Sequence, residues 1–247
     1  MQKYPIILLA IIALGAFLRF YQITEIPLGL YPDEAMNGNN ALEALADGNF
    51  KVFYPENNGR EGLFINIQAL SIAAFGNTPW ALRIVSALIG TLTILGMYLV
   101  ARELFRSRPV GLLASFFLAT SYWHLNFSRI GFRAIMLPLF ATFGMYFLLR
   151  GLRTGKPIHL IAAGILTGLG VHTYIAFRFM VFVFAVPVIH ALWRGRKAGK
   201  TAVAAGSVAI YAAAALIVLA PLGLYFFQHP EAFANRAGDV SIFSAAN

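Results

Sequence analysis

The sequence predicts an all-α polytopic membrane protein. Hydrophobic residues make up 59% of the chain and charged residues only 12%, whereas a soluble domain carries about 25% charged residues. The mean hydropathy is +0.71, and the apolar residues form runs long enough to cross a bilayer as helices, which satisfy their backbone polar groups without water. The net charge of +9 comes from Lys and Arg at the ends of these runs, so it indicates membrane topology and not nucleic-acid binding.

Seven apolar runs are expected to be the transmembrane helices: Pro5–Leu18, Ile84–Ala101, Pro109–Phe127, Ala134–Leu149, Ile158–Phe177, Phe179–Trp193 and Thr201–Gln228. The first is short, and we expect it to span the bilayer with Arg19 snorkelling to the interface. The same segment resembles a signal peptide, but the flank Arg19-Phe20-Tyr21 favours a retained helix. Residues 1–247 are then one transmembrane module, and residues 23–79 form its first loop.

The distribution of Lys and Arg predicts the orientation. Eleven of them fall on the side of the N-terminus and eight on the other side, and every joint between spans on the N-terminal side is a cluster. Cytoplasmic loops are enriched in Lys and Arg. We therefore expect a plasma-membrane protein with a cytoplasmic N-terminus and with loop 23–79 on the extracytoplasmic side.

The stretch Tyr31–Glu61 is an acidic island in this apolar chain, since seven of the ten acidic residues lie between Glu25 and Glu61. Pro32 suits the first turn of a helix, and Asp47-Gly48 suits its end. Asn57-Asn58-Gly59 predicts a turn, and Leu63–Phe75 predicts a second, short helix. Both helices are expected to lie on the membrane surface.

Helical spacing places Asp33, Asn37 and Asn40 on one face of the first loop helix, opposite Leu42 and Leu45. We expect the polar face to point into a cavity and the opposite face to lie on the membrane. Asp33 in the first turn is a candidate general base, with Glu34 as its neighbour. The alternative is that both carboxylates only complement the helix dipole.

Other polar residues of the predicted outer side are candidate ligand groups. Arg129, Arg133 and Arg178 stand where positive charge is disfavoured, and guanidinium groups bind phosphate through two parallel hydrogen bonds; the alternative is snorkelling to lipid headgroups. Arg60 is a fourth candidate phosphate ligand, and the alternative is a solvated loop pair with Glu61. Glu61 could bind substrate or hold a divalent metal through oxygen, with His229 as a second metal candidate, although no specific metal signature is present. Tyr54 could stack on a sugar. His172 could reach the site or be a hydrogen-bonded histidine between helices.

The residues YPDEAMNGNNAL, NNGREGLFINIQALSIAAFGNTPWALRIVSALIGTLTILGMYLVARELF, SRIGFRAIMLPL and TYIAFRF resemble the glycosyltransferase family 39 group. This group comprises membrane glycosyltransferases related to protein O-mannosyltransferases and to aminoarabinose-to-lipid A transferases. The likeness covers essentially the whole chain, and its most specific element is the Asp-Glu pair at Asp33 and Glu34.

The resemblance implies a GT-C fold, a polyprenyl-phosphate-linked sugar donor, and an active site on the outer face where Asp33 is the catalytic base. The expected reaction is an inverting transfer to a hydroxyl of a protein, lipid or glycan. Two departures stand out. Relatives often carry His-Pro-Pro or Lys-Pro-Pro where this chain has Gly59-Arg60-Glu61-Gly62, so a role of that basic residue would pass to Arg60. They are also about twice as long, so we expect this chain to lack a C-terminal half.

Two other classes remain open on the sequence. A transporter or lipid flippase would carry ionisable residues at mid-membrane, but the only carboxylate in the predicted spans and their flanks is Glu103, at a cytoplasmic end. A non-catalytic membrane subunit is the third alternative.

Overall fold

The computed structural model describes residues 3–233 and confirms the all-α membrane fold. Ten α-helices lie in this part of the chain: α1 Lys3–Phe20, α2 Pro32–Asp47, α3 Leu63–Phe75, α4 Pro79–Phe105, α5 Arg108–Thr120, α6 Tyr122–Arg129, α7 Met136–Thr154, α8 Pro157–Val171, α9 Met180–Lys197 and α10 Thr201–Gln228. Two 3-10 turns, Arg133–Ile135 and Ile175–Phe179, precede α7 and α9. Strands β1 Phe53–Tyr54 and β2 Arg60–Glu61 form a small antiparallel pair.

Each of the seven predicted apolar runs contains a helix, but in Ile158–Phe177 the α-helix ends at Val171 and the chain resumes as the 3-10 turn Ile175–Phe179. Among the described residues, five helices are long and apolar enough to cross a membrane: α1, α4, α7 with its preceding 3-10 turn, α9 with its preceding turn, and α10. Helices α5 and α8 are shorter, with 13 and 15 residues. The run Pro109–Phe127, expected as one helix, is divided into α5 and α6 because Ser121 has extended backbone angles.

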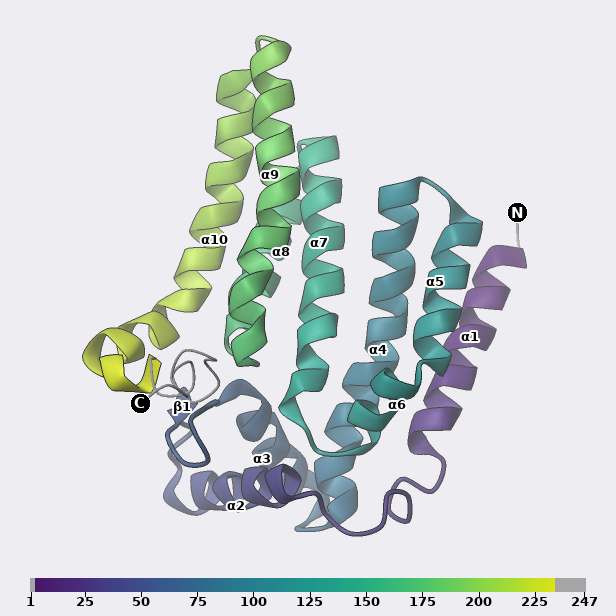
Figure 1. Ribbon diagram of the computed structural model, residues 1–247, viewed down its shortest axis with the longest axis vertical. Helices are drawn as coiled ribbons and strands as arrows, with labels where there is room; N and C mark the ends of the chain where they lie inside the picture. The colour runs from purple at the N-terminus through teal and green to yellow at the C-terminus, as the bar shows by residue number, and fades with distance from the viewer. Residues whose placement is uncertain (1–2, 234–247) are drawn as a thin grey trace, which may run out of the picture.

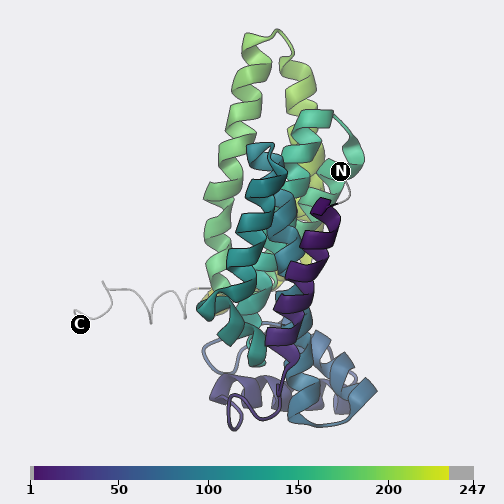
Figure 2. The same ribbon diagram turned by 90° about the vertical axis from the view of Figure 1, so that its right-hand side faces the viewer.

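The long helices form one bundle, and α2 and α3 gather with the β-pair under one end of it, as two perpendicular views show (Figures 1 and 2). We call this the α2 end. Helix α4 lies at the centre and packs against α1, α5 and α7, while α8 packs between α7 and α10. The fold therefore brings the loops that follow α1, α6 and α8 to the same end as the acidic island.

Helices α8 and α10 approach closely at Gly164 and Gly168. A side chain at either glycine would meet the backbone of α10, at the Tyr211 and Ala215 carbonyls. Small residues four apart are the usual means by which two membrane helices bring their backbones together, because lipid offers no hydrophobic drive for association. The close packing fixes α10 against α8.

Arg19 does not snorkel, contrary to the expectation from the sequence. Its side chain is fully buried between α1, α5 and α6. The guanidinium donates to the Gly15 and Ala119 carbonyls at 2.8 and 3.1 Å and lies 2.8 Å from Nδ1 of His124. A short α1 helix can bury this cation because the break at Ser121 exposes carbonyls at the end of α5 to it.

Helix α2 begins and ends where the sequence predicts. Pro32 is its first residue, the Glu34 side chain accepts from the Tyr31 backbone N–H at 3.2 Å, and Gly48 closes the helix with a left-handed φ of 64°. The Asn57-Asn58-Gly59 turn is also confirmed, with φ of 53°, 61° and 76°. These local signals set the ends of α2 and the turn of the β-pair without help from the rest of the fold.

The expected orientation of α2 is wrong in one respect. Asn37 and Asn40 are buried in protein and do not line an open cavity. Leu42 and Leu45 were expected to face lipid, but they are half-buried against the core formed by α2, α3 and the start of α4. The polar face finds its partners in the β-pair, which a helical pattern alone does not predict.

Candidate functional site

Asp33 lies half-exposed in the first turn of α2, at the α2 end of the bundle. Its Oδ1 accepts a hydrogen bond from Nδ2 of Asn57, in the turn between β1 and β2, at 2.7 Å. Asp33 is therefore an accessible carboxylate that the Asn57 amide holds in place.

Asn37 connects α2 to the elements that carry the candidate phosphate ligands. Its Nδ2 donates to the Gly131 carbonyl in the loop before α7, at 3.0 Å, and its Oδ1 accepts from Nη1 of Arg60 at 2.8 Å. Asn37 lies one helical turn after Asp33, so the two side chains share a face about 5–6 Å apart at Cβ. The loop before α7 and strand β2 are thus fixed beside Asp33.

A cluster of one carboxylate and two guanidinium groups lies next to this connection, and we call Glu61, Arg133 and Arg178 the Glu61 cluster. Glu61 is 2% exposed, and its Oε1 lies 3.4 Å from Nη2 of Arg178. Its Oε2 lies 3.7 Å from Nε of Arg133. Among these three side chains the two guanidinium groups outnumber the carboxylate, which favours an anionic ligand.

Aromatic rings fix both arginines of the Glu61 cluster. The Arg133 guanidinium lies 5.3 Å from the ring centre of Tyr174, and that of Arg178 lies 4.9 Å from the ring centre of Phe226 in α10. Each arginine stands on a 3-10 turn at the start of a long helix, α7 or α9. Arg133 and Arg178 are far apart in the sequence, but the fold brings both of them to Glu61.

Glu34 has a different environment from its neighbour. Its side chain is fully buried and pairs with Arg83 of α4, whose Nε lies 2.9 Å from Oε1. Arg83 is buried too, and its Nη1 donates to the carbonyls of Ile23 and Pro27 at 2.8 and 3.0 Å. The pair fastens α2 and the α1–α2 loop to α4, so the geometry favours a positioning role for Glu34 over contact with a substrate.

Two of the predicted phosphate ligands are held in structural contacts. Arg60 is fully buried, and its guanidinium donates to the Asn37 and Asn40 side chains. Arg129 donates to backbone carbonyls of the loop after α1, including those of Leu18 and Ile26, at 2.6 and 2.8 Å. Both arginines hold elements of the α2 end together.

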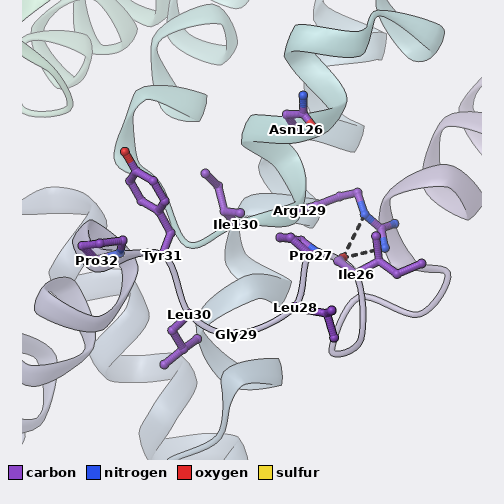
Figure 3. Close-up of a pocket in the computed structure, with 10 residues that line it drawn as sticks. All are labelled: Ile26, Pro27, Leu28, Gly29, Leu30, Tyr31, Pro32, Asn126, Arg129 and Ile130. Carbon is purple, nitrogen blue, oxygen red and sulfur yellow. Dashed lines mark hydrogen bonds between the residues drawn. The ribbon is translucent and has the colours of Figure 1, made fainter.

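A pocket of about 460 Å³ lies beside the start of α2, and Arg129 braces one of its walls through the Ile26 carbonyl (Figure 3). The loop between α1 and α2 makes most of the lining, which consists of Ile26, Pro27, Leu28, Gly29, Leu30, Tyr31, Pro32, Asn126, Arg129 and Ile130. The part of the lining that the α1–α2 loop provides ends at Pro32, the residue before Asp33. The pocket is largely apolar, and Tyr31, Asn126 and Arg129 are the lining residues whose side chains carry polar atoms.

Tyr54 cannot stack on a sugar in this structure, because its side chain is 1% exposed within the core of α2, α3 and α4. Its hydroxyl donates to Oδ1 of Asn66 at 2.9 Å, and burial raises the pKa of the phenol. His172 is the interhelical histidine of the alternative interpretation, with Nε2 2.9 Å from the Val218 carbonyl of α10.

The metal candidates are not brought together by the described residues. His229 stacks on Tyr225 at 4.5 Å between ring centres, and its Nδ1 lies 3.1 Å from the Tyr225 carbonyl. Glu61 lies against two guanidinium groups, which oppose a cation. Within residues 3–233, no group of three or more His, Cys, Asp or Glu side chains could share a metal ion.

The sequence pattern did not predict that Arg83 is buried and paired with a carboxylate. It belongs to the Trp-x-x-Arg segment that starts at Trp80, but nothing local marks it as buried. The available signal was an arginine in the first turns of a transmembrane helix, where burial requires a counter-ion. The structure supplies Glu34 as that counter-ion.

The profile of the family described as dolichyl-phosphate-mannose-protein mannosyltransferase matches residues 63–225, about two thirds of the chain. The chain belongs to this family. The match runs from α3 to α10, so it includes Arg133 and Arg178 and begins two residues after Glu61. The resemblance to membrane glycosyltransferases of the GT-C class is thereby confirmed.

One curated relative is a protein of Bacillus subtilis (strain 168) named as a putative mannosyltransferase, YkcB. It is 25% identical to this chain over 189 residues, which are 73% of this chain. The chain spans about a quarter of the length of this relative. Membership of a glycosyltransferase family is therefore established for the membrane module, and the activity of the protein is a matter for proposal.

Proposed function

We propose that this chain forms the active-site module of an inverting membrane glycosyltransferase, which moves a sugar from a polyprenyl-phosphate donor to a hydroxyl group on the outer face of the plasma membrane. The observation that carries the proposal is the convergence of Asp33 with the Glu61 cluster at one end of the bundle. A protein, lipid or glycan could provide the hydroxyl.

Arg133 and Arg178 bind the donor phosphate in this proposal. A phosphate that leaves the anomeric carbon gains negative charge, and fixed guanidinium groups stabilise that charge without reorganisation. The Tyr174 and Phe226 rings hold the two arginines in place. Glu61 also holds them, with its carboxylate oxygens 3.7 Å from Nε of Arg133 and 3.4 Å from Nη2 of Arg178. The positions of both residues at the start of long apolar helices suit a phosphate at the membrane surface with its prenyl chain in lipid.

Asp33 accepts the proton of the acceptor hydroxyl. As the O–H bond breaks, the oxygen attacks the anomeric carbon, and the bond from that carbon to the phosphate oxygen breaks with its electron pair leaving on the phosphate. A single displacement of this kind inverts the anomeric centre, and a positioned base contributes roughly 10²–10⁴ in rate. The acceptor approaches through the pocket lined by Tyr31 and Pro32, which immediately precede Asp33.

The choice of donor tests the proposal. The full-length protein in proteoliposomes is incubated with polyprenyl-phosphate mannose or GDP-mannose, each radiolabelled in the sugar, together with a membrane extract that supplies acceptors. We expect label transfer from the lipid-linked sugar alone, and digestion of the intact product by anomer-specific mannosidases should show a linkage inverted relative to the donor. Transfer from the nucleotide sugar without a lipid-linked intermediate would refute the proposal.

A further inference from the structure

A second, larger cavity lies at the end of the bundle opposite the α2 end. It is a groove of about 1160 Å³ between α7, α9 and α10, on the side of the α9–α10 hairpin that rises beyond α7 in Figure 1. Its apolar walls include Met145, Leu149, Leu152, Val183, Val186 and Val203. Its polar end holds Arg106, Arg153, Arg194 and Lys200. We call it the α7–α9 groove.

The groove is long and open to lipid. From Val183 to Arg194 the wall formed by α9 covers twelve residues, or about 16 Å along the helix axis. Val183, Val186 and Val203 are each exposed by about half or more, at 48%, 67% and 68%. Pro187 lines the groove within α9 and cannot donate a backbone hydrogen bond to the Val183 carbonyl.

The polar end carries an uncompensated positive charge. Glu103 is the only acidic residue between positions 62 and 230, and Arg153 holds it through two hydrogen bonds of 2.6 and 3.1 Å. Within residues 3–233, the side chains of Arg106, Arg194 and Lys200 make no hydrogen bond or ion pair, so three cations surround the mouth of an apolar groove. The enrichment of Lys and Arg in cytoplasmic loops explains their presence at this end of the bundle, but it does not explain why they surround one cavity.

We propose that the α7–α9 groove binds one anionic phospholipid of the leaflet at this end, which the charge distribution predicts to be cytoplasmic. The headgroup phosphate lies among Arg106, Arg194 and Lys200, and an acyl chain follows the apolar wall towards Val183. A soluble phosphate would leave that wall uncovered, and an apolar peptide would leave the cations without partners. Basic pockets between membrane helices on the cytoplasmic side are suited to anionic headgroups.

Trp193 provides a reporter one residue before Arg194. It is 53% exposed, and Lys197 lies over its ring at 4.0 Å. The other two tryptophans, Trp80 and Trp123, lie on α4 and α6 at or towards the α2 end. In a Trp80→Phe/Trp123→Phe background, the full-length protein is placed in vesicles of phosphatidylcholine that contain brominated phosphatidylglycerol or brominated phosphatidylcholine, and quenching of Trp193 is measured.

We expect brominated phosphatidylglycerol to quench Trp193 at a lower mole fraction than brominated phosphatidylcholine. Near an anionic headgroup each Lys or Arg strengthens binding by roughly fivefold. The variant Arg194→Gln/Lys200→Gln should therefore weaken the preference for the anionic lipid by about twenty-five-fold. The matched variant Lys156→Gln/Arg196→Gln removes the same charge at the same end of the bundle but outside the groove, and should retain the preference.

Ala191→Phe tests the apolar part, because it fills the groove and keeps every cation; it should abolish the preference. Equal quenching by the two lipids would overturn the proposal and would indicate that protein covers the groove. An equal loss in the matched variant would also overturn it, since general surface charge would then explain the effect. A preference that survives in Ala191→Phe would place the lipid outside the groove.

Discussion

Replacing Glu34 by alanine should destabilise the protein strongly, because the change strands a buried cation. Arg83 is 1% exposed and its ion pair with Glu34 has an N–O distance of 2.9 Å. The loop carbonyls around Arg83 carry only partial charges, so they cannot replace the carboxylate. Loss of one partner from a buried pair costs about 3–5 kcal/mol, and for a chain of this size each kcal/mol lowers Tm by about 2–4 °C.

The assay is thermal unfolding of the purified protein in detergent. We expect Glu34→Ala to lower Tm by about 6–20 °C on these figures, whereas Asp47→Ala, which removes an exposed carboxylate from the last turn of the same helix, should change Tm by little. The double variant Glu34→Leu/Arg83→Met should unfold at a higher temperature than either single variant, since it leaves no unpaired buried charge.

The comparison also separates a positioning role from a catalytic one. If Glu34 only positions α2, Glu34→Gln should keep the turnover per folded molecule within a few-fold of the parent while Tm falls. A Tm of Glu34→Ala equal to that of Asp47→Ala would refute the reasoning from the buried pair. Loss of turnover in a fully folded Glu34→Gln protein would show that Glu34 takes part in catalysis.

Four further variants test other parts of the account. Arg133→Lys should raise KM for the lipid-linked donor, because lysine cannot make two parallel hydrogen bonds to phosphate, and should change Tm little because it keeps a cation beside Glu61. Arg129→Gln should lower Tm because it releases the loop carbonyls. A lower Tm with an unchanged KM in Arg133→Lys would show that Arg133 is structural. Tyr54→Phe should cost about 1 kcal/mol of stability through the lost hydrogen bond to Asn66 with unchanged turnover, and a turnover defect would restore the sugar-binding interpretation. Arg19→Leu should lower Tm by several degrees, while no change would mean that water reaches this site.

Local signals in the sequence predicted the frame of the candidate site. Pro32 and Gly48 mark the ends of α2 by backbone chemistry that needs no tertiary contact, and the Asn57-Asn58-Gly59 turn follows from left-handed preferences. The apolar runs predicted the helices of the bundle, because a helix satisfies the hydrogen bonds of its own backbone in lipid.

Contacts between distant residues could not be predicted in this way. The amides of Asn37 and Asn40 are buried because Arg60, twenty or more positions along the chain, reaches them. Arg129 was expected to bind phosphate, but more than a hundred positions separate it from the carbonyls that it holds. An arginine near the membrane surface has the same local pattern in both roles, so only its partners distinguish them.

The turnover of Asp33→Asn tests the central claim most directly. The full-length protein with this substitution is compared with Asp47→Asn, which makes the same chemical change at the exposed far end of α2, in the transfer of labelled mannose from polyprenyl phosphate. We expect Asp33→Asn to fold and to bind donor while turnover falls by about 10²–10⁴, and Asp47→Asn to remain active. Near-normal turnover of Asp33→Asn would contradict the assignment of Asp33 as the base.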